Sequence, residues 1–157
     1  MGLGKLLTGE ADFRRLAELA ADGSREKADL LVGDIYGDLS WLPDSDQTGK
    51  HHHINAGVDV PLDSKLTAAN FANRRETPSK ADKMAALSNM IAESAVLLTA
   101  QAAKLNHSEK VYFIGNTLTG NVSLKQGLMK YCGMIGLDAG FLANGEFSGA
   151  LGAYLSI

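Results

Sequence analysis

The feature that most constrains the fold is an alternation of short apolar runs and helical stretches in the second half of the chain. The run Lys110–Ile114 is rich in β-branched and aromatic residues and predicts a buried strand. A helical stretch follows from Ser123 to about Met134, then a second short strand around Ala139–Leu142 and a glycine-rich helix over Asn144–Ala153. Because strands joined through a helix pair in parallel with a right-handed crossover, the pattern predicts an α/β fold.

The turn after the first of these strands is the best local candidate for a ligand site. It runs from Gly115 through Asn116 and Thr117 to Asn121. In parallel sheets ligands bind beyond the carboxyl ends of the strands, and a glycine there lets the backbone approach them closely. A turn that needs glycine and asparagine for its own geometry would carry the same residues, so the pattern alone leaves both interpretations open.

A long helix is expected from Thr77-Pro78-Ser79 to about Leu105. Its start is predicted by a hydroxyl cap and a proline in the first turn. Residues spaced three or four apart define one face: Met84, Ser88, Ile91, Ala95, Leu98 and Ala102. The small residues among them would let another helix approach closely, as at a domain or subunit interface. An ordinary core helix would show the same pattern.

The first half of the chain is less regular. A helix is expected from Glu10 to Ala21, with Gly23 as its stop. The stretch Lys27–Gly37 is apolar, but its periodicity does not decide between helix and strand. Residues 38–65 contain two of the three prolines with several Asp and Gly, which predicts a loop or an insertion.

Composition excludes several functional classes. The 157 residues carry a net charge of −3, so no basic surface for nucleic acid is expected. No apolar run reaches the roughly 18 residues that indicate a membrane span, and the N-terminal residues lack the pattern of a signal peptide. The single cysteine, Cys132, cannot form an intrachain disulfide, and a cytoplasmic location is expected.

No residue pattern assigns a reaction by itself. The run His51–His53 would form a metal site only if three adjacent imidazoles converged on one ion, so a solvated loop is favoured and no metal ligand is expected. Cys132 lies in an expected helix without a basic partner, which favours a buried thiol over a nucleophile. Neither a GxxxxGK[ST] nor a GxGxxG pattern occurs.

Six short motifs follow one another along nearly the whole chain: GLGKLLT at 2–8, LLVGDIYG at 30–37, LTAANF at 66–71, TPS at 77–79, VYFIGN at 111–116 and NGEFSGALGA at 144–153. In this order and spacing they resemble the type II (eukaryote-like) pantothenate kinases, which belong to the actin-like superfamily with many sugar kinases. The resemblance implies that residues 1–157 form one globular unit, the C-terminal portion of an actin-like, ribonuclease H-like kinase fold. It also implies transfer of the γ-phosphate of ATP, with Mg²⁺, to the primary hydroxyl of pantothenate, the first step towards coenzyme A.

The same resemblance implies roles for individual residues. Phe13 matches a position beside the adenine ring, and Gly115 and Asn116 match the turn that contacts the nucleotide. The residues that match the pantothenate pocket, partly across a dimer interface, are Thr67, Ala68 and Tyr131. The family usually has a small hydroxyl residue where Asn116 stands; asparagine keeps an acceptor and adds donors.

The family's catalytic groups have no counterpart in these motifs. Its members begin with a phosphate loop of the Asp-Gly-Gly-Thr type and later supply a catalytic carboxylate. Phosphoryl transfer depends on positioning and on stabilising charge around the phosphates. We therefore expect no catalytic residue here, no activity from this chain alone, and a truncated or split part of a pantothenate kinase that works as a homodimer or with a complementary N-terminal half.

Two alternatives stay open. One is a non-catalytic partner that binds nucleotide or pantothenate-like ligands, or that only scaffolds a dimer. The other is a different kinase of the superfamily, such as an N-acetylglucosamine kinase; the motif at 66–71 and Tyr131 argue against it, because they match the pantothenate side. In either case strands without their partners would leave unpaired edges, so an oligomer is expected.

Overall fold

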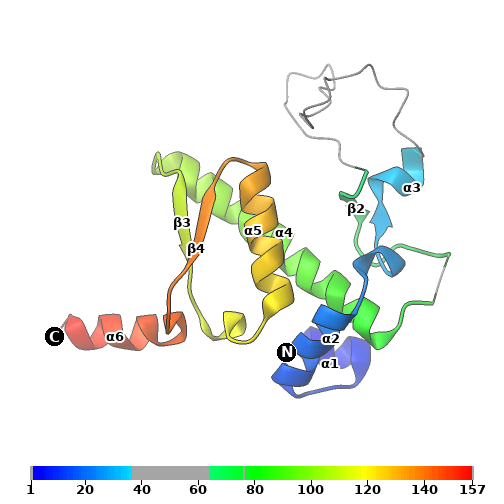
Figure 1. The fold of residues 1–157 in the computed structure, drawn as a ribbon, viewed down its shortest axis with the longest axis horizontal. Coiled ribbons are helices and arrows are strands. Elements are labelled where there is room, and N and C mark those ends of the chain that lie inside the picture. The colour runs from blue at the N-terminus through cyan, green and yellow to red at the C-terminus, as the bar shows by residue number, and fades with distance from the viewer. Residues whose placement is uncertain (1, 37–63, 76, 157) are drawn as a thin grey trace. The chain divides into compact units, whose positions relative to one another are not determined.

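The structure is a computed structural model that describes residues 2–36, 64–75 and 77–156 (Figure 1). The chain divides into two units: residues up to 25 together with those from 78 onward, and residues 26–77. Each unit is described by itself, and the single globular unit expected over 1–157 stays a prediction. Most of the 38–65 insertion and the histidines at 51–53 lie outside the described residues.

The first unit contains both the long helix and the strand–helix–strand–helix succession. Its elements are α1 (Gly2–Thr8), α2 (Phe13–Asp22), α4 (Lys80–Leu105), β3 (Lys110–Phe113), the 3₁₀ turn η3 (Asn116–Leu118), α5 (Val122–Met134), β4 (Asp138–Phe141), the 3₁₀ turn η4 (Gly145–Phe147) and α6 (Ser148–Leu155). The order expected from the sequence is confirmed, with boundaries moved by a few residues. The helix α1 was not predicted.

The start of α4 corrects one expectation. Ser79 is the N-cap, and Pro78 lies before the cap rather than in the first turn. The reason is a capping box with Asp82: the Ser79 hydroxyl accepts from Asp82 N at 3.1 Å, and the Asp82 carboxylate accepts from Ser79 N at 3.0 Å. The other Asp82 oxygen accepts from Ser24 N at 2.9 Å, which ties the chain after α2 to the start of α4.

Packing of α4 against α1, α2 and α5 forms the core of this unit (Figure 1). Small residues allow close approach: a Cβ added at Gly127 of α5 would lie 2.8 Å from the Cβ of Ala92, which is fully buried. The residues expected to form one buried face of α4 are only partly buried. Met84 and Ser88 are buried, but Ile91 and Leu98 are exposed. The buried positions further along α4 are instead Ala92, Val96 and Ala103.

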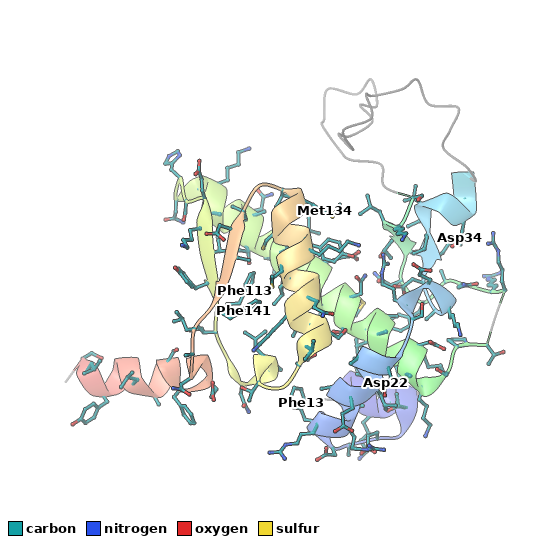
Figure 2. All side chains as sticks on the ribbon, in the orientation of Figure 1. Phe13, Asp22, Asp34, Phe113, Met134 and Phe141 are labelled. Atoms are coloured by element: carbon teal, nitrogen blue, oxygen red, sulfur yellow. The ribbon has the colours of Figure 1, made fainter. Side chains whose placement is uncertain are left out.

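The two strands of this unit pair in parallel, as predicted, in the register Lys110–Asp138 to Phe113–Phe141. The rings of Phe113 and Phe141 face each other across the pair with centroids 6.1 Å apart (Figure 2). The expectation of a buried strand is wrong: β3 alternates between exposed and half-buried residues. Within the described residues β3 has β4 as its only neighbouring strand, so no third strand covers its other edge.

The second unit pairs β1 (Leu30–Leu31) with β2 (Thr67–Ala69) in antiparallel fashion, and α3 (Val32–Tyr36) follows β1 directly. The 3₁₀ turn η1 (Arg25–Lys27) precedes them. The apolar stretch whose type was left open is therefore a short strand and a short helix in succession. Asp29 is fully buried, and its carboxylate accepts from Phe71 N at 2.9 Å, which holds the chain after β2 against the residue before β1.

Candidate functional site

A cavity of about 140 Å³ lies in the first unit where α2, α4 and α5 meet the turn after β3. Its floor is apolar, and a few polar groups interrupt it near the turn. The residues that line it are Gly4, Phe13, Leu16, Ala17, Ala20, Met84, Leu87, Ser88, Ile91, Thr117, Asn121 and Leu124. An apolar hollow with a small number of placed polar groups is the usual form of a small-molecule site.

Phe13 is the first residue of α2 and lines this cavity (Figure 2). Its position is set by the Asp12 cap, whose carboxylate accepts from Arg15 N at 2.9 Å. The ring is half-buried, so one part packs against the helices while another part stays accessible. Of the residues expected beside a nucleotide, Phe13 therefore contributes an aromatic side chain to the cavity.

The turn after β3 contains a backbone conformation that favours glycine. Gly115 has φ +125°, a conformation that disfavours any residue with a Cβ. From there the chain turns through η3, so that Thr117 and Asn121 line the same cavity as Phe13. Asn121 also caps α5, since its side-chain oxygen accepts from Leu124 N at 3.2 Å. The structure thus brings Phe13 and this turn together.

The two nucleotide residues expected at the turn lie elsewhere on it. Gly115 lines a separate small cavity of about 30 Å³, together with Lys125 and Glu146 among others. Asn116 is exposed, and it is not among the residues that line the larger cavity. Of the turn, Thr117 and Asn121 therefore face the same cavity as Phe13, whereas Gly115 and Asn116 do not.

Ser88 is a polar residue among the apolar side chains that line the cavity. Its spacing on α4 placed it among the apolar positions, and it is indeed buried, with 5% of its surface exposed. Its hydroxyl oxygen has no hydrogen-bond partner in the part of the chain that the structure describes. A serine in the middle of an apolar helix face was the available signal, because buried polar groups usually have partners.

Tyr131 lies on α5 and is buried against α4. Its hydroxyl oxygen is 2.7 Å from Asn89 Oδ1 and 2.8 Å from Glu93 Oε1. Burial of the phenol, followed by its hydrogen bond to Glu93, raises the pKa of Tyr131 above the ordinary value of 10.0. The phenol therefore stays protonated at neutral pH, and its one proton is donated to these two side-chain oxygens, which leaves the phenol oxygen as an acceptor.

Beside this tyrosine is a wider and more polar cavity of about 400 Å³. Asn89 lines it, as do the cations Arg25 and Lys130 and the polar side chains of Ser123 and Gln126. The Lys130 ammonium lies 5.4 Å from the centroid of the Tyr131 ring. This cavity can accommodate a polar molecule, and its two cations favour one that carries negative charge.

The other two residues expected at the pantothenate pocket belong to the second unit. Thr67 and Ala68 lie on β2, where Thr67 pairs with Leu31 of β1. Thr67 is half-buried and Ala68 is exposed. They are thus in a different unit from Tyr131, and their part in a common pocket stays a prediction.

Three further observations concern the chemistry available to the chain. Cys132 is fully buried on α5, and burial raises the pKa of its thiol, as expected for a structural cysteine. The described residues contain no group of three or more His, Cys, Asp or Glu side chains that could hold a metal ion. None of their helices combines the length and the apolar character that a membrane crossing requires.

Comparison with known proteins defines the class of this chain. The family model described as Fumble matches residues 1–156. The chain therefore belongs to the Fumble family.

Individual relatives carry a more specific name. A protein of Oceanobacillus iheyensis named type II pantothenate kinase is 38% identical over 157 residues, which are 99% of this chain and 53% of that protein. Proteins of the same name from Bacillus cereus and Staphylococcus haemolyticus are 34% and 31% identical over 99% and 97% of this chain. The chain spans about half the length of these curated relatives.

Proposed function

We propose that this chain is the nucleotide-side part of a type II pantothenate kinase, an ATP-dependent phosphotransferase that acts on pantothenate in coenzyme A biosynthesis. The observation that carries the proposal is similarity along nearly the whole chain to relatives of that name. The proposal is also supported by a cavity of about 140 Å³, the size of a ring, beside the turn that follows the parallel strand β3.

The α2–α4–α5 cavity is the proposed adenine site. An engineered apolar cavity of roughly 150 Å³ takes up benzene, so a hollow of this size suits one flat ring system that enters from its open side. Phe13 supplies an aromatic face for stacking, and Thr117 and Asn121 supply polar groups at the turn. Gly115 and Asn116 would contact the ribose or the phosphates further along the nucleotide, where an exposed amide and a glycine backbone are accessible.

Tyr131, Thr67 and Ala68 are proposed to contact pantothenate. The phenol oxygen of Tyr131, whose proton is donated to Asn89 or Glu93, can accept from a hydroxyl or amide N–H of the substrate, and the adjoining cavity carries the cations Arg25 and Lys130. Pantothenate is a small polar anion, which suits a hollow of that charge. The residues of this chain would bind and orient the two substrates rather than take part in the bond changes.

Phosphoryl transfer also needs Mg²⁺, a phosphate-binding loop and a carboxylate that accepts the proton of the attacking hydroxyl. We propose that groups outside the motifs of this chain supply them. The whole enzyme would then be an actin-like kinase of the cytoplasm, active as a homodimer in which this part contributes to the substrate pocket.

The direct test is complementation. The chain is coexpressed with the portion of the Oceanobacillus iheyensis relative that it does not match, and ATP-dependent phosphorylation of labelled pantothenate is measured on the purified complex. We expect activity from the complex and none from either part alone. A stable complex without activity would overturn the proposal.

The same complex distinguishes the roles of the two sites. Phe13→Ala should raise the KM for ATP several-fold because a stacked aromatic is lost, with little change in the KM for pantothenate. An inactive complex that still binds ATP analogues and pantothenate in calorimetric titrations would instead indicate a non-catalytic binding partner.

A further inference from the structure

The small cavity beside Gly115 lies where both strands of the parallel pair end. This strand-end cavity has a volume of about 30 Å³ and lies between the turns η3 and η4. The residues that line it are Phe113, Ile114, Gly115, Leu118, Thr119, Lys125, Phe141, Leu142, Gly145 and Glu146. Ligands of α/β sheets bind beyond the carboxyl ends of the strands, so the strand-end cavity occupies the position of a ligand site.

Two half-buried side chains of opposite charge line the strand-end cavity. Lys125 comes from α5, and its ammonium lies 5.5 Å from the centroid of the Phe141 ring, which holds it near the end of β4. Glu146 comes from η4, which packs against the residue after β3: a Cβ added at Gly145 would lie 3.6 Å from the Cα of Ile114. Two separate elements therefore place a cation and a carboxylate at the same cavity.

In the part of the chain that the structure describes, neither the Lys125 ammonium nor the Glu146 carboxylate has a hydrogen bond or an ion pair, and they do not pair with each other. The strand-end cavity thus offers one donor group and one acceptor group around a space for one or two water-sized groups. A hydroxyl complements both, because its oxygen can accept from the ammonium while its proton is donated to the carboxylate. A phosphate does not suit the space beside Glu146, because two negative charges repel each other.

The strand-end cavity adjoins the α2–α4–α5 cavity along the chain. Thr117 lines the larger cavity, whereas the next residues, Leu118 and Thr119, line the strand-end cavity. On α5, Leu124 lines the larger cavity and Lys125 the smaller one. Because neighbouring Cα atoms are about 3.8 Å apart, the two cavities are separated by little more than the thickness of the backbone. A nucleoside, whose sugar is bonded directly to its base, can reach both.

We infer that the strand-end cavity receives a ribose hydroxyl of a nucleoside ligand, which donates to the Glu146 carboxylate and accepts from the Lys125 ammonium. The inference rests on the proposed function, in which the nucleoside is the adenosine part of ATP, and it assigns selectivity for ribose over deoxyribose to Glu146. A site built to hydrogen-bond a hydroxyl rejects the analogue that lacks it, because the carboxylate is then desolvated without a partner.

The measurement compares adenosine with 2′-deoxyadenosine and 3′-deoxyadenosine in titrations of the ¹⁵N-labelled chain, followed by two-dimensional NMR. The wild-type chain should bind adenosine about five- to tenfold more tightly than at least one deoxy analogue, because a hydrogen bond to a half-buried carboxylate is lost. Glu146→Ala should bind adenosine and that analogue equally well, since either change removes the same hydrogen bond. Glu146→Gln keeps an acceptor oxygen without the charge and should keep part of the preference.

The matched control is Glu109→Ala. Glu109 is an exposed glutamate directly before β3, at the opposite end of the same strand, so its loss should leave the ribose preference unchanged. Lys125→Met removes the donor but keeps an apolar side chain of similar length. It should reduce the same preference, because the hydroxyl oxygen loses its partner.

The remaining outcomes separate this inference from the proposed function. Equal affinity of the wild-type chain for all three nucleosides, or an unchanged preference in Glu146→Ala, would overturn the inference and leave the kinase proposal in place. Loss of the preference in Glu109→Ala would also overturn it, because the preference would then depend on net charge. Absence of adenosine binding to the chain would overturn it as well. Failure of the complementation would count against the kinase proposal, independently of Glu146.

Discussion

A single hydroxyl connects the two longest helices of the first unit. Asn89 and Glu93 stand one turn apart on α4, so their side chains lie on the same face and both reach Tyr131 of α5. The phenol is buried, and its proton is held more tightly in the folded chain than in the unfolded one. Tyr131 is therefore both a candidate substrate contact and a packing residue. The first role would affect substrate binding, and the second affects the free energy of unfolding.

Tyr131→Phe should lower the free energy of unfolding by about 1–2 kcal/mol at pH 8, because one buried hydrogen bond is lost. The difference from the wild-type chain should shrink as the pH rises above about 10. A raised native pKa stabilises the fold fully below the unfolded pKa of tyrosine, and this stabilisation is lost as the pH rises towards the native pKa. Urea titrations at pH 8 and pH 11 measure both effects.

The control for this prediction is Tyr154→Phe on α6, where the ring is exposed and no stability change is expected. A difference between wild type and Tyr131→Phe that stayed constant across this pH range would show that the phenol is not held protonated by its buried position.

At the scale of elements, close contact between α4 and α5 depends on a missing side chain. The Cβ of Ala92 lies where a Cβ of Gly127 would meet it at 2.8 Å, well inside van der Waals contact. The same helix has a second glycine, Gly133, around which nothing lies within 4 Å of such a Cβ. One glycine is thus required by packing, while the other only lowers the helix propensity of α5.

Gly127→Ala should therefore destabilise the chain by about 1–3 kcal/mol, since the added methyl forces the two helices apart. Gly133→Ala, the matched control, should stabilise it by about 0.5–1 kcal/mol through reduced backbone entropy of the unfolded chain. Chemical denaturation of the two variants measures both values. Equal effects of the same sign would contradict the packing argument.

The start of α4 offers a second test at this scale. Ser79→Ala should cost about 1 kcal/mol because it removes one half of the capping box. Thr77→Ala should have little effect, since Thr77 is exposed and lies two residues before the cap. Thermal unfolding of the two variants checks the assignment, and a larger loss of stability for Thr77→Ala would contradict Ser79 as the cap.

On the scale of the whole molecule, the described residues leave many large apolar side chains exposed. Within the described residues each sheet has two strands, and β3 has one edge without a neighbouring strand. Apolar side chains after the strands are exposed as well, including Ile114, Leu142, Leu151 and Leu155. Unpaired strand edges and contiguous apolar patches favour association with another chain.

We therefore predict that the isolated chain associates with itself at micromolar concentrations. Sedimentation velocity over a dilution series should show a species larger than the monomer that dissociates on dilution. Addition of the remainder of the relative should replace it with a complex of defined stoichiometry. A monodisperse monomer at all concentrations would contradict the prediction.

Much of the first unit could be predicted because its signals are local. The helix over 122–134 and the parallel pair β3–β4 follow from residue type and spacing, and so does burial of Cys132. The start of α4 was expected too early, with Pro78 in the first turn, because Thr77 and Ser79 are both good cap residues. Only the carboxylate of Asp82 distinguishes them, through its bonds to Ser79 and Ser24.

What the sequence determined by itself is the succession of elements, the glycine turn after β3 and the family, since each depends on neighbouring residues or on ordered motifs. The tertiary structure decided which face of α4 is buried and which residues share a cavity. Leu98 is exposed and Ser88 is buried although the same periodicity contains both, because α5 and α2 cover only part of that helix. Phe13, Ser88 and Thr117 come from three separate segments, and only long-range packing brings them together.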